Sequence, residues 1–570
     1  MCLNCGCNAE PSKVELVKEA SRALRGTITE DLANDSPTFA EANAQLLKFH
    51  GVYQQEDRDR RKEARKRGLD RHYQMMVRTR VPGGRVSPEG YLAHDDIAQS
   101  WGNGTLRITT RQDFQLHGIL KGDLWSSIHA INDALMTTLG GCGDQVRNVM
   151  CCPAPIHDQL RAELQEALPT LVAGLTPTTG AYHQIWIDGE QAAGSEPEPD
   201  PLYGTRYLPR KFKVGLAVEG DNCIDVYSHD LGLVAMRGPD GGLAGFDVLV
   251  GGGLGRTNNK PDTYPAVARP LAFVATEHLV ETARAVVAVQ RDYGNRGDRR
   301  HARLKYLLAE RGLPWFREQV QSRVPFQLAA PRPLRWEALD DHLGWHEQGD
   351  GRWFYGLFVE NGRIHDEGDM RLRTALRALV EEHRPVIWMT AQQNLIVADV
   401  APDRRDAIER LLADHGVTPT ERVSQTVRNA MACPAVPTCG LAVAESERVL
   451  PDLARRIERL AAELGLAEER ISFRMTGCPN GCARPYLGDV GFVGTTLGKY
   501  DVFLGGDFLG TRLNSLFAHN VPLDEIPALL RGPLTAFAAE RQAGEGFGDW
   551  CHRVGLEALR GRFAAEGAPA

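Results

Sequence analysis

The sequence lacks the features that would place it in a membrane, on a nucleic acid or among secreted, disulfide-rich proteins. Its 570 residues contain no apolar run long enough to cross a bilayer. Its net charge is −8 and it has no basic tail, so nucleic acid is not expected as a partner. The N-terminal residues have neither the basic start nor the hydrophobic core of a secretory signal, and we therefore expect a cytoplasmic protein. The motif C-x-x-C-H is absent, which excludes a c-type haem.

Cysteine is present in quantity, with twelve residues spread along the chain. Without an export signal, this number favours reduced thiols and metal chemistry over a disulfide framework. Two pairs stand near the C-terminal end, Cys433 with Cys439 and Cys478 with Cys482, and both lie among prolines and glycines. Such residues let a backbone wrap around a bound group, and four thiolates are what a [4Fe-4S] cluster needs.

Two other interpretations of these four cysteines stay open on spacing alone. Zinc ligands in a pair usually have two to four residues between them. Cys478 and Cys482 fit this range, whereas the spacing between Cys433 and Cys439 is wider than it. Unrelated buried thiols are the second alternative, because free cysteine packs well in cores. Of the remaining cysteines, we expect adventitious thiols at a disordered N-terminus and buried thiols further on. These are Cys2, Cys5 and Cys7 in the first group, and Cys142, Cys151 and Cys223 in the second.

The chain contains one unit twice. V-R-N-V-M-C-C-P-A-P at 146–155 matches V-R-N-A-M-A-C-P-A-V at 427–436, an offset of 281 residues (427 − 146). A period this long is not a solenoid repeat and predicts a duplicated pair of domains with pseudo-twofold symmetry. The further matched segments are 84–86 with 362–364, 111–116 with 392–397, and 246–252 with 500–506.

The two copies differ in their chemistry. Cys152 is the first-copy counterpart of Cys433, yet the first copy has no C-P-N-G-C. At the corresponding place we expect Y-L-P-R-K-F-K-V, residues 207–214, which offers cations where the second copy offers thiols. One copy is therefore expected to hold a cluster and the other to face a small anion.

Residue patterns predict sheets that carry helices in a duplicated α+β fold. Alternating apolar residues predict strands at 105–110, 115–120, 387–390 and 395–400. Helical periodicity predicts helices at 277–291 and 441–464, and a loop is expected at 194–201.

Taken together, the motifs resemble the sirohaem-dependent sulfite and nitrite reductases. The resemblance rests on C-x5-C followed by T-G-C-P-N-G-C-A-R, and it extends over nearly the whole chain, from about residue 47 to residue 549. It implies a [4Fe-4S] cluster on Cys433, Cys439, Cys478 and Cys482, with Cys482 bridging to the iron of sirohaem.

The resemblance also implies a domain layout of ferredoxin-like half-domains and two larger mixed α/β domains that bind the cofactors. The expected parts are an N-terminal extension at 1–70, a half-domain at 71–140, a sirohaem and substrate domain at 141–335, a second half-domain at 336–420, and a [4Fe-4S] and sirohaem domain at 421–570.

For the substrate anion, the resemblance assigns Arg80, Arg147, Lys211 and Lys213. Arginine donates paired hydrogen bonds to oxyanions, and lysine is a point charge that can give up a proton. Strand periodicity would place Lys211 and Lys213 on one face. Without the resemblance, each would be read as a solvated surface charge. Lys213 favours sulfite, since nitrite reductases of this family have asparagine there.

For the tetrapyrrole carboxylates, seven residues are candidates: Arg107, Arg111, Gln115, His117, Arg210, Lys305 and Asn480. Buried Arg107 and Arg111 would need anionic partners, which the macrocycle provides. His117 is equally well read as an ordinary core histidine. The glycine-rich run 249–256 fails the dinucleotide pattern at Arg256, so we expect close backbone approach there instead.

The resemblance thus implies an assimilatory six-electron reduction of sulfite to sulfide. A nitrite reductase on the same scaffold is the nearest alternative, and a non-catalytic metal-binding or regulatory protein is another. The chain shows no flavin or nicotinamide motif, so electrons must come from a protein partner. The family uses either an NADPH-oxidising flavoprotein subunit or a ferredoxin, and the sequence leaves this choice open.

Overall fold

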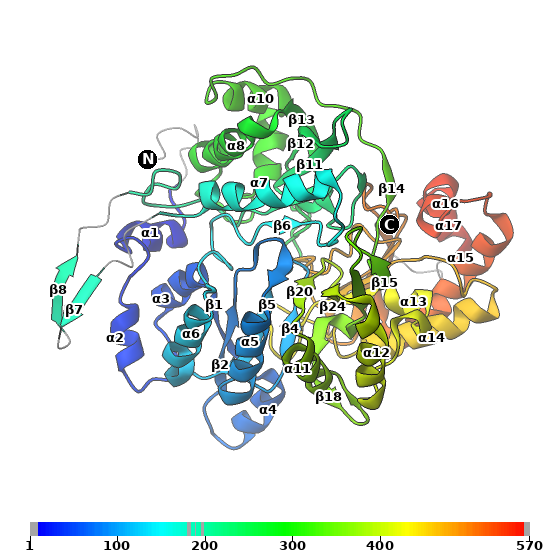
Figure 1. The fold of residues 1–570 in the computed structure, drawn as a ribbon, viewed down its shortest axis with the longest axis horizontal. Helices are drawn as coiled ribbons and strands as arrows, with labels where there is room; N and C mark the ends of the chain where they lie inside the picture. The colour runs from blue at the N-terminus through cyan, green and yellow to red at the C-terminus, as the bar shows by residue number, and fades with distance from the viewer. Residues whose placement is uncertain (1–9, 179–183, 188–189, 195–198, 564–570) are drawn as a thin grey trace.

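The computed structural model describes residues 10–178, 184–187, 190–194 and 199–563 (Figure 1). Cys2, Cys5 and Cys7 lie outside the described residues, as does part of the loop expected at 194–201. In Figure 1 the two half-domains lie side by side, with the first larger sheet above them and the C-terminal helices beside the second half-domain. No helix in the described ranges has the length and apolar character needed to span a membrane.

Two five-stranded sheets form the half-domains, and each takes its last strand from the other copy. The first runs β1(Val52–Glu56), β2(Tyr73–Arg78), β5(Phe114–Ile119), β4(Leu106–Ile108), β17(Arg363–Ile364). The second runs β15(Gly344–Glu347), β16(Trp353–Leu357), β21(Leu395–Val400), β20(Val386–Met389), β3(Arg85–Val86). The exchanged strands β3 and β17 are the matched segments 84–86 and 362–364, so the pseudo-twofold relation is built into the sheets. The first sheet begins at β1, inside the stretch expected as an extension.

One hydrophobic core serves both half-domains and contains residues from each. Four helices cover the sheets: α5(Pro88–Ser100), α6(Leu124–Asp133), α11(Leu372–His383) and α12(Arg405–Asp414). α5 packs on α11, which joins the copies a second time. Its start follows from sequence, because Ser87 caps the amide of Gly90 (3.0 Å) and Pro88 occupies the first turn.

The two larger sheets repeat a single topology, three parallel strands followed by two antiparallel ones. The first contains β6(Met150–Cys151), β9(Val214–Val218), β11(Leu231–Arg237), β12(Leu243–Val250) and β13(Arg269–Val274). The second contains β22(Ala430–Ala432), β23(Phe473–Thr476), β24(Val490–Thr496), β25(Lys499–Leu504) and β26(Ser515–Pro522). The first sheet also takes β10(Gly220–Asp221) and β14(Trp336–Ala338).

The strand register corrects the alignment of the two copies. Leu231 pairs with Val214 in the first sheet, and Val490 pairs with Phe473 in the second. The loop after β9, residues 219–230, is therefore the counterpart of the cysteine loop 477–489 after β23. The expected counterpart, 207–214, is wrong because it ends where β9 begins. At the offset of 259 residues that this register sets (490 − 231), Cys223, Tyr227 and Asp230 match Cys482, Tyr486 and Asp489.

The strands expected at 105–110, 115–120, 387–390 and 395–400 are confirmed as β4, β5, β20 and β21. The helix expected at 277–291 is confirmed as α8(Leu279–Tyr293), which packs with α7(Gln159–Leu175). The helix expected from 441 begins only at 450, as α14(Leu450–Glu463), which packs on α15(Ile526–Glu540). Residues 441–449 form turns instead, because the amides of Val443 and Ala444 bond to the carbonyl of Gly477.

Candidate site for an iron–sulfur cluster and an anion

Four cysteines converge beyond the carboxyl ends of β22 and β23. Cys433 directly follows β22, and its sulfur accepts the amide of Gly477 (3.4 Å). Cys478 lies two residues after β23, and its sulfur accepts the side-chain amide of Asn480 (3.6 Å). Cys433 and Cys439 contact a small apolar cluster of Met431, Ala435, Val436, Ala442 and Ala483. Cys433 and Cys478 are therefore buried and Cys439 is partly buried.

The electrostatics of these thiols call for a cationic partner. Burial, together with the charge of Cys482, raises the pKa of Cys433, Cys439 and Cys478. A bound metal centre reverses this, because coordination deprotonates a thiol outright. All four are free thiols.

The spacing of the four sulfurs does not fit a single zinc ion. Among the described residues, one group of three or more possible ligands has all its ligand atoms within 4.8 Å, and it contains none of these four cysteines. Thiolates on one zinc ion would lie roughly 4 Å apart. A multi-iron cluster is larger than one ion and does not require its four thiolates to lie this close together.

Cys482 is the exposed member of the set and faces the first copy. Its carbonyl accepts the hydroxyl of Thr110 (3.0 Å). It is close enough to Arg78, Lys211 and Lys213 to interact with them electrostatically. The thiol thus lies where the cations of copy one and the cysteine loop of copy two meet.

Lys211, Lys213 and Arg147 form a concentrated positive site. Burial, reinforced by Arg147 and Arg210, lowers the pKa of Lys211 to about 7. Burial and the adjacent Lys211 lower the pKa of Lys213 well below its usual value. Both shifts mean that the charged forms lack enough nearby anions, and an oxyanion bound here would relieve them.

Arg147 and Arg80 are fixed differently. Arg147 donates from Nε to the carbonyl of Gly143 (3.2 Å), while its amide bonds to Phe212 (3.0 Å). Arg80 donates to the hydroxyl of Thr176 (2.7 Å), its Nε is buried without a partner, and burial lowers its pKa. Of the four cations expected to bind the anion, Arg80 therefore interacts least with the charged groups around Lys211.

Arg107 finds its anion within the protein. Its Nε lies 3.0 Å from Glu447, and its Nη2 donates to the carbonyls of Asn361 (3.0 Å) and Ala432 (2.9 Å). Burial alone would raise the pKa of Glu447, but Arg107 and Arg363 lower it to about 2. Glu447 therefore gives Arg107 a counter-charge within the protein, and Arg107 supports the strand end beside Cys433; its contact with the macrocycle stays a prediction.

Arg111 and His117 keep unmet hydrogen-bonding capacity. Arg111 donates to the carbonyls of Asn148 and Val214, yet its Nε is buried without a partner, and burial lowers its pKa to about 9. Both ring nitrogens of His117 are buried without partners, and burial lowers its pKa well below normal. Such groups are costly unless a ligand satisfies them.

The other expected tetrapyrrole contacts separate into two kinds. Gln115 contacts Arg78, Arg210 lies 3.9 Å from Asp144, and Asn480 contacts Cys478, so all three border the site. Lys305 is different: its ammonium donates to the carbonyls of Gly253 and Gly255 (both 2.9 Å) and of Tyr264. All its donors are used in holding the glycine-rich loop.

That loop shows the close backbone approach expected from its glycines. A Cβ on Gly252 would lie 2.2 Å from the carbonyl oxygen of Tyr227 and 2.4 Å from that of His229. The amide of Arg256 bonds to the carbonyl of Pro479 (2.8 Å), which joins the loop to the cysteine segment. The glycines therefore pack chain against chain beside the site.

Comparisons with known proteins show which proteins this chain is similar to. Residues 171–328 and 424–566 match the Nitrite and sulphite reductase 4Fe-4S domain, and residues 67–133 and 346–415 match the Nitrite/Sulfite reductase ferredoxin-like half domain. The sulfite reductase (NADPH) hemoprotein beta-component of Staphylococcus saprophyticus is 46% identical over 95% of this chain and 96% of its own. The sulfite reductase (ferredoxin) of Synechococcus elongatus is 46% identical over 96% of this chain and 90% of its own.

The chain belongs to the nitrite and sulphite reductase family. Mycobacterium tuberculosis NirA has the same fold, with a TM-score of 0.79 at 24% identity, covering 96% of this chain and 98% of that one. The cofactors of the chain are accordingly a [4Fe-4S] cluster and sirohaem. The converging thiols, and the unpartnered atoms of Arg111 and His117, fit these groups.

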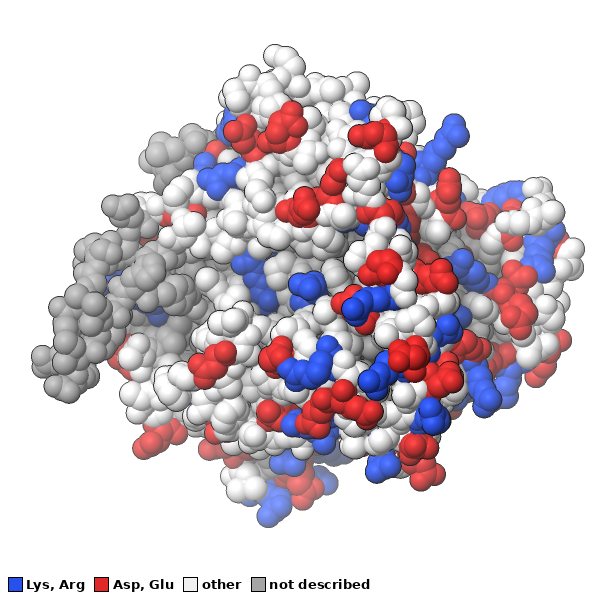
Figure 2. Space-filling model, in the orientation of Figure 1, with Lys and Arg blue, Asp and Glu red and all other residues white. Residues whose placement is uncertain are grey.

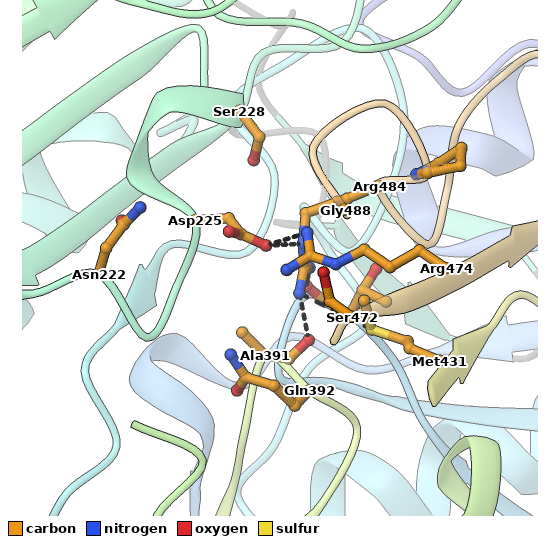
Figure 3. A network of polar contacts seen from close by, with 12 residues as sticks. Asn222, Asp225, Ser228, Ala391, Gln392, Met431, Ser472, Arg474, Arg484 and Gly488 are labelled. Atoms are coloured by element: carbon orange, nitrogen blue, oxygen red, sulfur yellow. Dashed lines mark hydrogen bonds and ion pairs between the residues drawn. The ribbon is translucent and has the colours of Figure 1, made fainter. Parts of the chain in front are cut away.

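Sequence reasoning missed the ion pairs that join the copies of this reductase fold. Asp225, on the loop after β9, binds Arg474 of β23 (2.7 Å) and Arg484 of the cysteine loop (Figure 3). Arg484 also donates to the carbonyls of Ala391 (2.8 Å) and Thr110 (3.1 Å). Arg484 stands in the C-P-N-G-C-A-R motif and had a sequence signal; Asp225 had none.

A second missed pair supports the lysines. Arg303 donates to Asp230 through Nε (2.9 Å) and Nη2 (2.8 Å), and all of this pair is buried. The same carboxylate accepts the amide of Lys213 (2.8 Å). Asp230 therefore fixes the backbone that presents Lys213, while its own charge is neutralised by Arg303.

Proposed function

We propose that this chain is the haemoprotein of an assimilatory sulfite reductase and reduces sulfite to sulfide with six electrons. The observation that carries the proposal is the meeting of an exposed cysteine, Cys482, with the half-buried lysines Lys211 and Lys213. Relatives at 46% identity over nearly the full length are named sulfite reductases. When bound, the cluster and the sirohaem supply the electrons and the iron at which the oxyanion is reduced.

In this proposal Cys433, Cys439, Cys478 and Cys482 hold the cluster, and Cys482 also reaches toward the tetrapyrrole. Arg111, Gln115, His117, Arg210 and Asn480 would contact the macrocycle. Arg107 and Lys305 act as positioning residues, because the protein itself uses their donors. Their roles are to hold β4 and the glycine-rich loop against the bound groups.

Arg80, Arg147, Lys211 and Lys213 would bind sulfite. Each charge-assisted hydrogen bond contributes about 1.5–3 kcal/mol, so several together orient the anion and polarise its S–O bonds as charge builds on the leaving oxygen. Lys211 suits proton transfer, because a pKa near 7 lets its ammonium release a proton at neutral pH. The oxygens leave as water, which requires such donors.

Turnover with a reduced viologen dye tests the activity without a protein donor. We expect sulfite-dependent dye oxidation and sulfide as product. Protein that contains iron, acid-labile sulfide and sirohaem, yet oxidises no dye with either sulfite or nitrite, would support the non-catalytic alternative.

Replacing Lys213 with asparagine tests the choice of anion. A singly charged anion needs less positive charge, so kcat/KM for sulfite should fall relative to that for nitrite. Lys499→Asn, at an exposed position on β25, is the matched control. An unchanged ratio would refute the use of Lys213 to distinguish the two anions.

The electron donor is a separate protein in this proposal. Relatives named for NADPH and for ferredoxin match this chain equally well, at 46% identity. On the face in Figure 2, basic and acidic residues are interspersed. We expect a cytoplasmic partner; turnover with a ferredoxin and with an NADPH-oxidising flavoprotein, compared at equal concentrations, decides which one.

A further inference from the structure

A second set of metal-ligating side chains lies in the first copy, away from the four cluster cysteines. Cys152, Asp221, Cys223 and His342 bring one ligand atom each to within 4.8 Å of all the others. All four are buried, with Cys223 fully so. The sequence indicated Cys152 only as the counterpart of Cys433, and Cys223 only as a buried thiol. The proposed reduction of sulfite assigns no role to these four side chains.

The position of this set follows from the duplication. Cys152 comes directly after β6, as Cys433 comes directly after β22. Asp221 and Cys223 lie at the start of the loop after β9, which is the counterpart of the cysteine loop after β23. Two of the four side chains are therefore cysteines at the places where the second copy holds its cluster.

His342 comes from the segment between β14 and β15 and is oriented by two aspartates. Its Nε2 is buried, has no hydrogen-bond partner and lies 3.7 Å from Asp221 Oδ2. Its Nδ1 lies 3.6 Å from Asp340, and its amide bonds to the same residue (2.8 Å). A carboxylate behind a histidine is the usual outer shell of a metal site, and it leaves Nε2 to face the metal.

Asp221 is oriented in the same way. Its Oδ1 accepts the amide of Asp340 (3.1 Å), which leaves Oδ2 toward His342. The oxygen of Asp221 that the backbone does not use therefore faces the same point as Nε2 of His342.

We propose that Cys152, Cys223, His342 and Asp221 bind one structural zinc ion. Two sulfurs, one imidazole nitrogen and one carboxylate oxygen form a closed tetrahedral set that zinc accepts. Zinc bonds of about 2.0–2.3 Å place neighbouring ligand atoms roughly 3.3–3.8 Å apart, which agrees with the 3.7 Å between His342 and Asp221. The four ligands are buried, so no position stays open for substrate.

The ion would fasten three separate segments at one point. His342 leads into the second half-domain, while Asp221 and Cys223 begin the loop that carries Asp225. Asp225 holds Arg474 and Arg484, and Arg484 is two residues from Cys482. The side-chain amide of Gln392 also bonds to the carbonyl of Cys223 (2.6 Å). The zinc site would therefore support, from the first copy, the loop that carries Cys482.

Metal analysis of the full-length holoprotein, produced with iron and zinc supplied, tests this proposal independently of sulfite reduction. We expect about one zinc per chain in addition to iron. Cys223→Ser and His342→Gln should each remove the zinc and lower the unfolding temperature, while Cys151→Ala, next to the site on β6, should keep it. Zinc-edge X-ray absorption of unmodified protein should give two sulfur and two nitrogen or oxygen ligands.

Three results would overturn the proposal. The first is unmodified protein with full iron content and less than roughly a tenth of an equivalent of zinc. The second is zinc that persists in both soluble variants, since it would then be bound elsewhere. The third is a disulfide between Cys152 and Cys223 in freshly isolated protein. The X-ray absorption measurement uses unmodified protein, so it tests the proposal even if a variant folds poorly.

Discussion

The two larger sheets share one strand order and differ in the segments that leave their parallel strands. After β22 and β23 the chain supplies four cysteines, and after β6 and β9 it supplies Cys152, Asp221, Cys223 and Asp225. The lysines Lys211 and Lys213 come before β9, on the approach to the same junction. The two sheets therefore provide the same scaffold. The short segments that follow their parallel strands determine which charged groups each copy contributes to the shared site.

The largest effect is expected from removing a thiol of copy two. Cys478→Ser should abolish the [4Fe-4S] cluster and reduce sulfite turnover to background, because the remaining ligands cannot complete the cluster. Iron and acid-labile sulfide analysis, with the visible spectrum, measures this. Cys551→Ser, a buried cysteine of the same copy outside the site, should retain both the cluster and turnover. Equal losses in the two variants would contradict the assignment.

Removing the ion pairs that join the two copies at Asp225 should have the next largest effect. Asp225→Ala leaves Arg474 and Arg484 buried without their carboxylate, which costs about 3–5 kcal/mol. Thermal unfolding of the holoprotein should show a lower midpoint and earlier loss of the cluster. The matched control is Asp524→Ala, whose exposed pair with Arg456 contributes less than about 1 kcal/mol. Equal midpoints for the two variants would show that this link between copies is not structural.

A smaller effect is expected from removing one cation of copy one. Lys213→Met keeps the volume and removes the charge, so kcat/KM for sulfite should fall roughly 10- to 150-fold, the equivalent of one charge-assisted bond. The cluster and sirohaem contents should stay the same. Lys499→Met serves as the exposed control. A wild-type kcat/KM in the Lys213 variant would remove that residue from the proposed anion site.

The smallest effect concerns pH. The pKa of Lys211 is lowered to about 7 by burial and by Arg147, so its ammonium is charged below that pH and neutral above it. Sulfite affinity should therefore weaken as pH rises through this region, by up to roughly tenfold. Bound anions raise the pKa, so the midpoint in the holoprotein lies at or above 7. Optical titration of wild type and Lys211→Met measures it.

The ionisation of sulfite itself affects both proteins alike, so the difference between them reports on Lys211. Identical pH profiles for wild type and Lys211→Met would contradict its role as a titrating cation.

The sequence predicted the elements whose signal is local. The alternating strands β4, β5, β20 and β21 are where periodicity places them. The cysteine spacing favoured a cluster but left zinc and unrelated buried thiols open, and the family resemblance decided between them. The internal repeat and the residue patterns predicted the duplicated α+β architecture, which the paired sheets confirm, and the family resemblance added the ferredoxin-like half-domains. Lys211 and Lys213, two residues apart, both lie within electrostatic reach of Cys482, and their binding of sulfite stays a prediction.

Features that depend on distant partners could not be predicted. Lys305 binds three carbonyl groups that lie 41 to 52 residues away in the sequence. The residues next to Lys305 therefore gave no indication of its structural role. Arg107 meets Glu447 across the two copies, and Asp225 meets Arg484 in the same way. The start of α14 was missed because tertiary bonds to Gly477 override the helix propensity of residues 441–449.

The exchange of β3 and β17 has a consequence for how this chain can be divided. Cut between the copies, each fragment would lack the outermost strand of its own small sheet and would carry the strand that completes the other. Neither piece would have a finished edge, yet the two would fit one another when mixed. The duplicated unit has the architecture of a dimer fused into one polypeptide, in which each half needs the other to complete its small sheet.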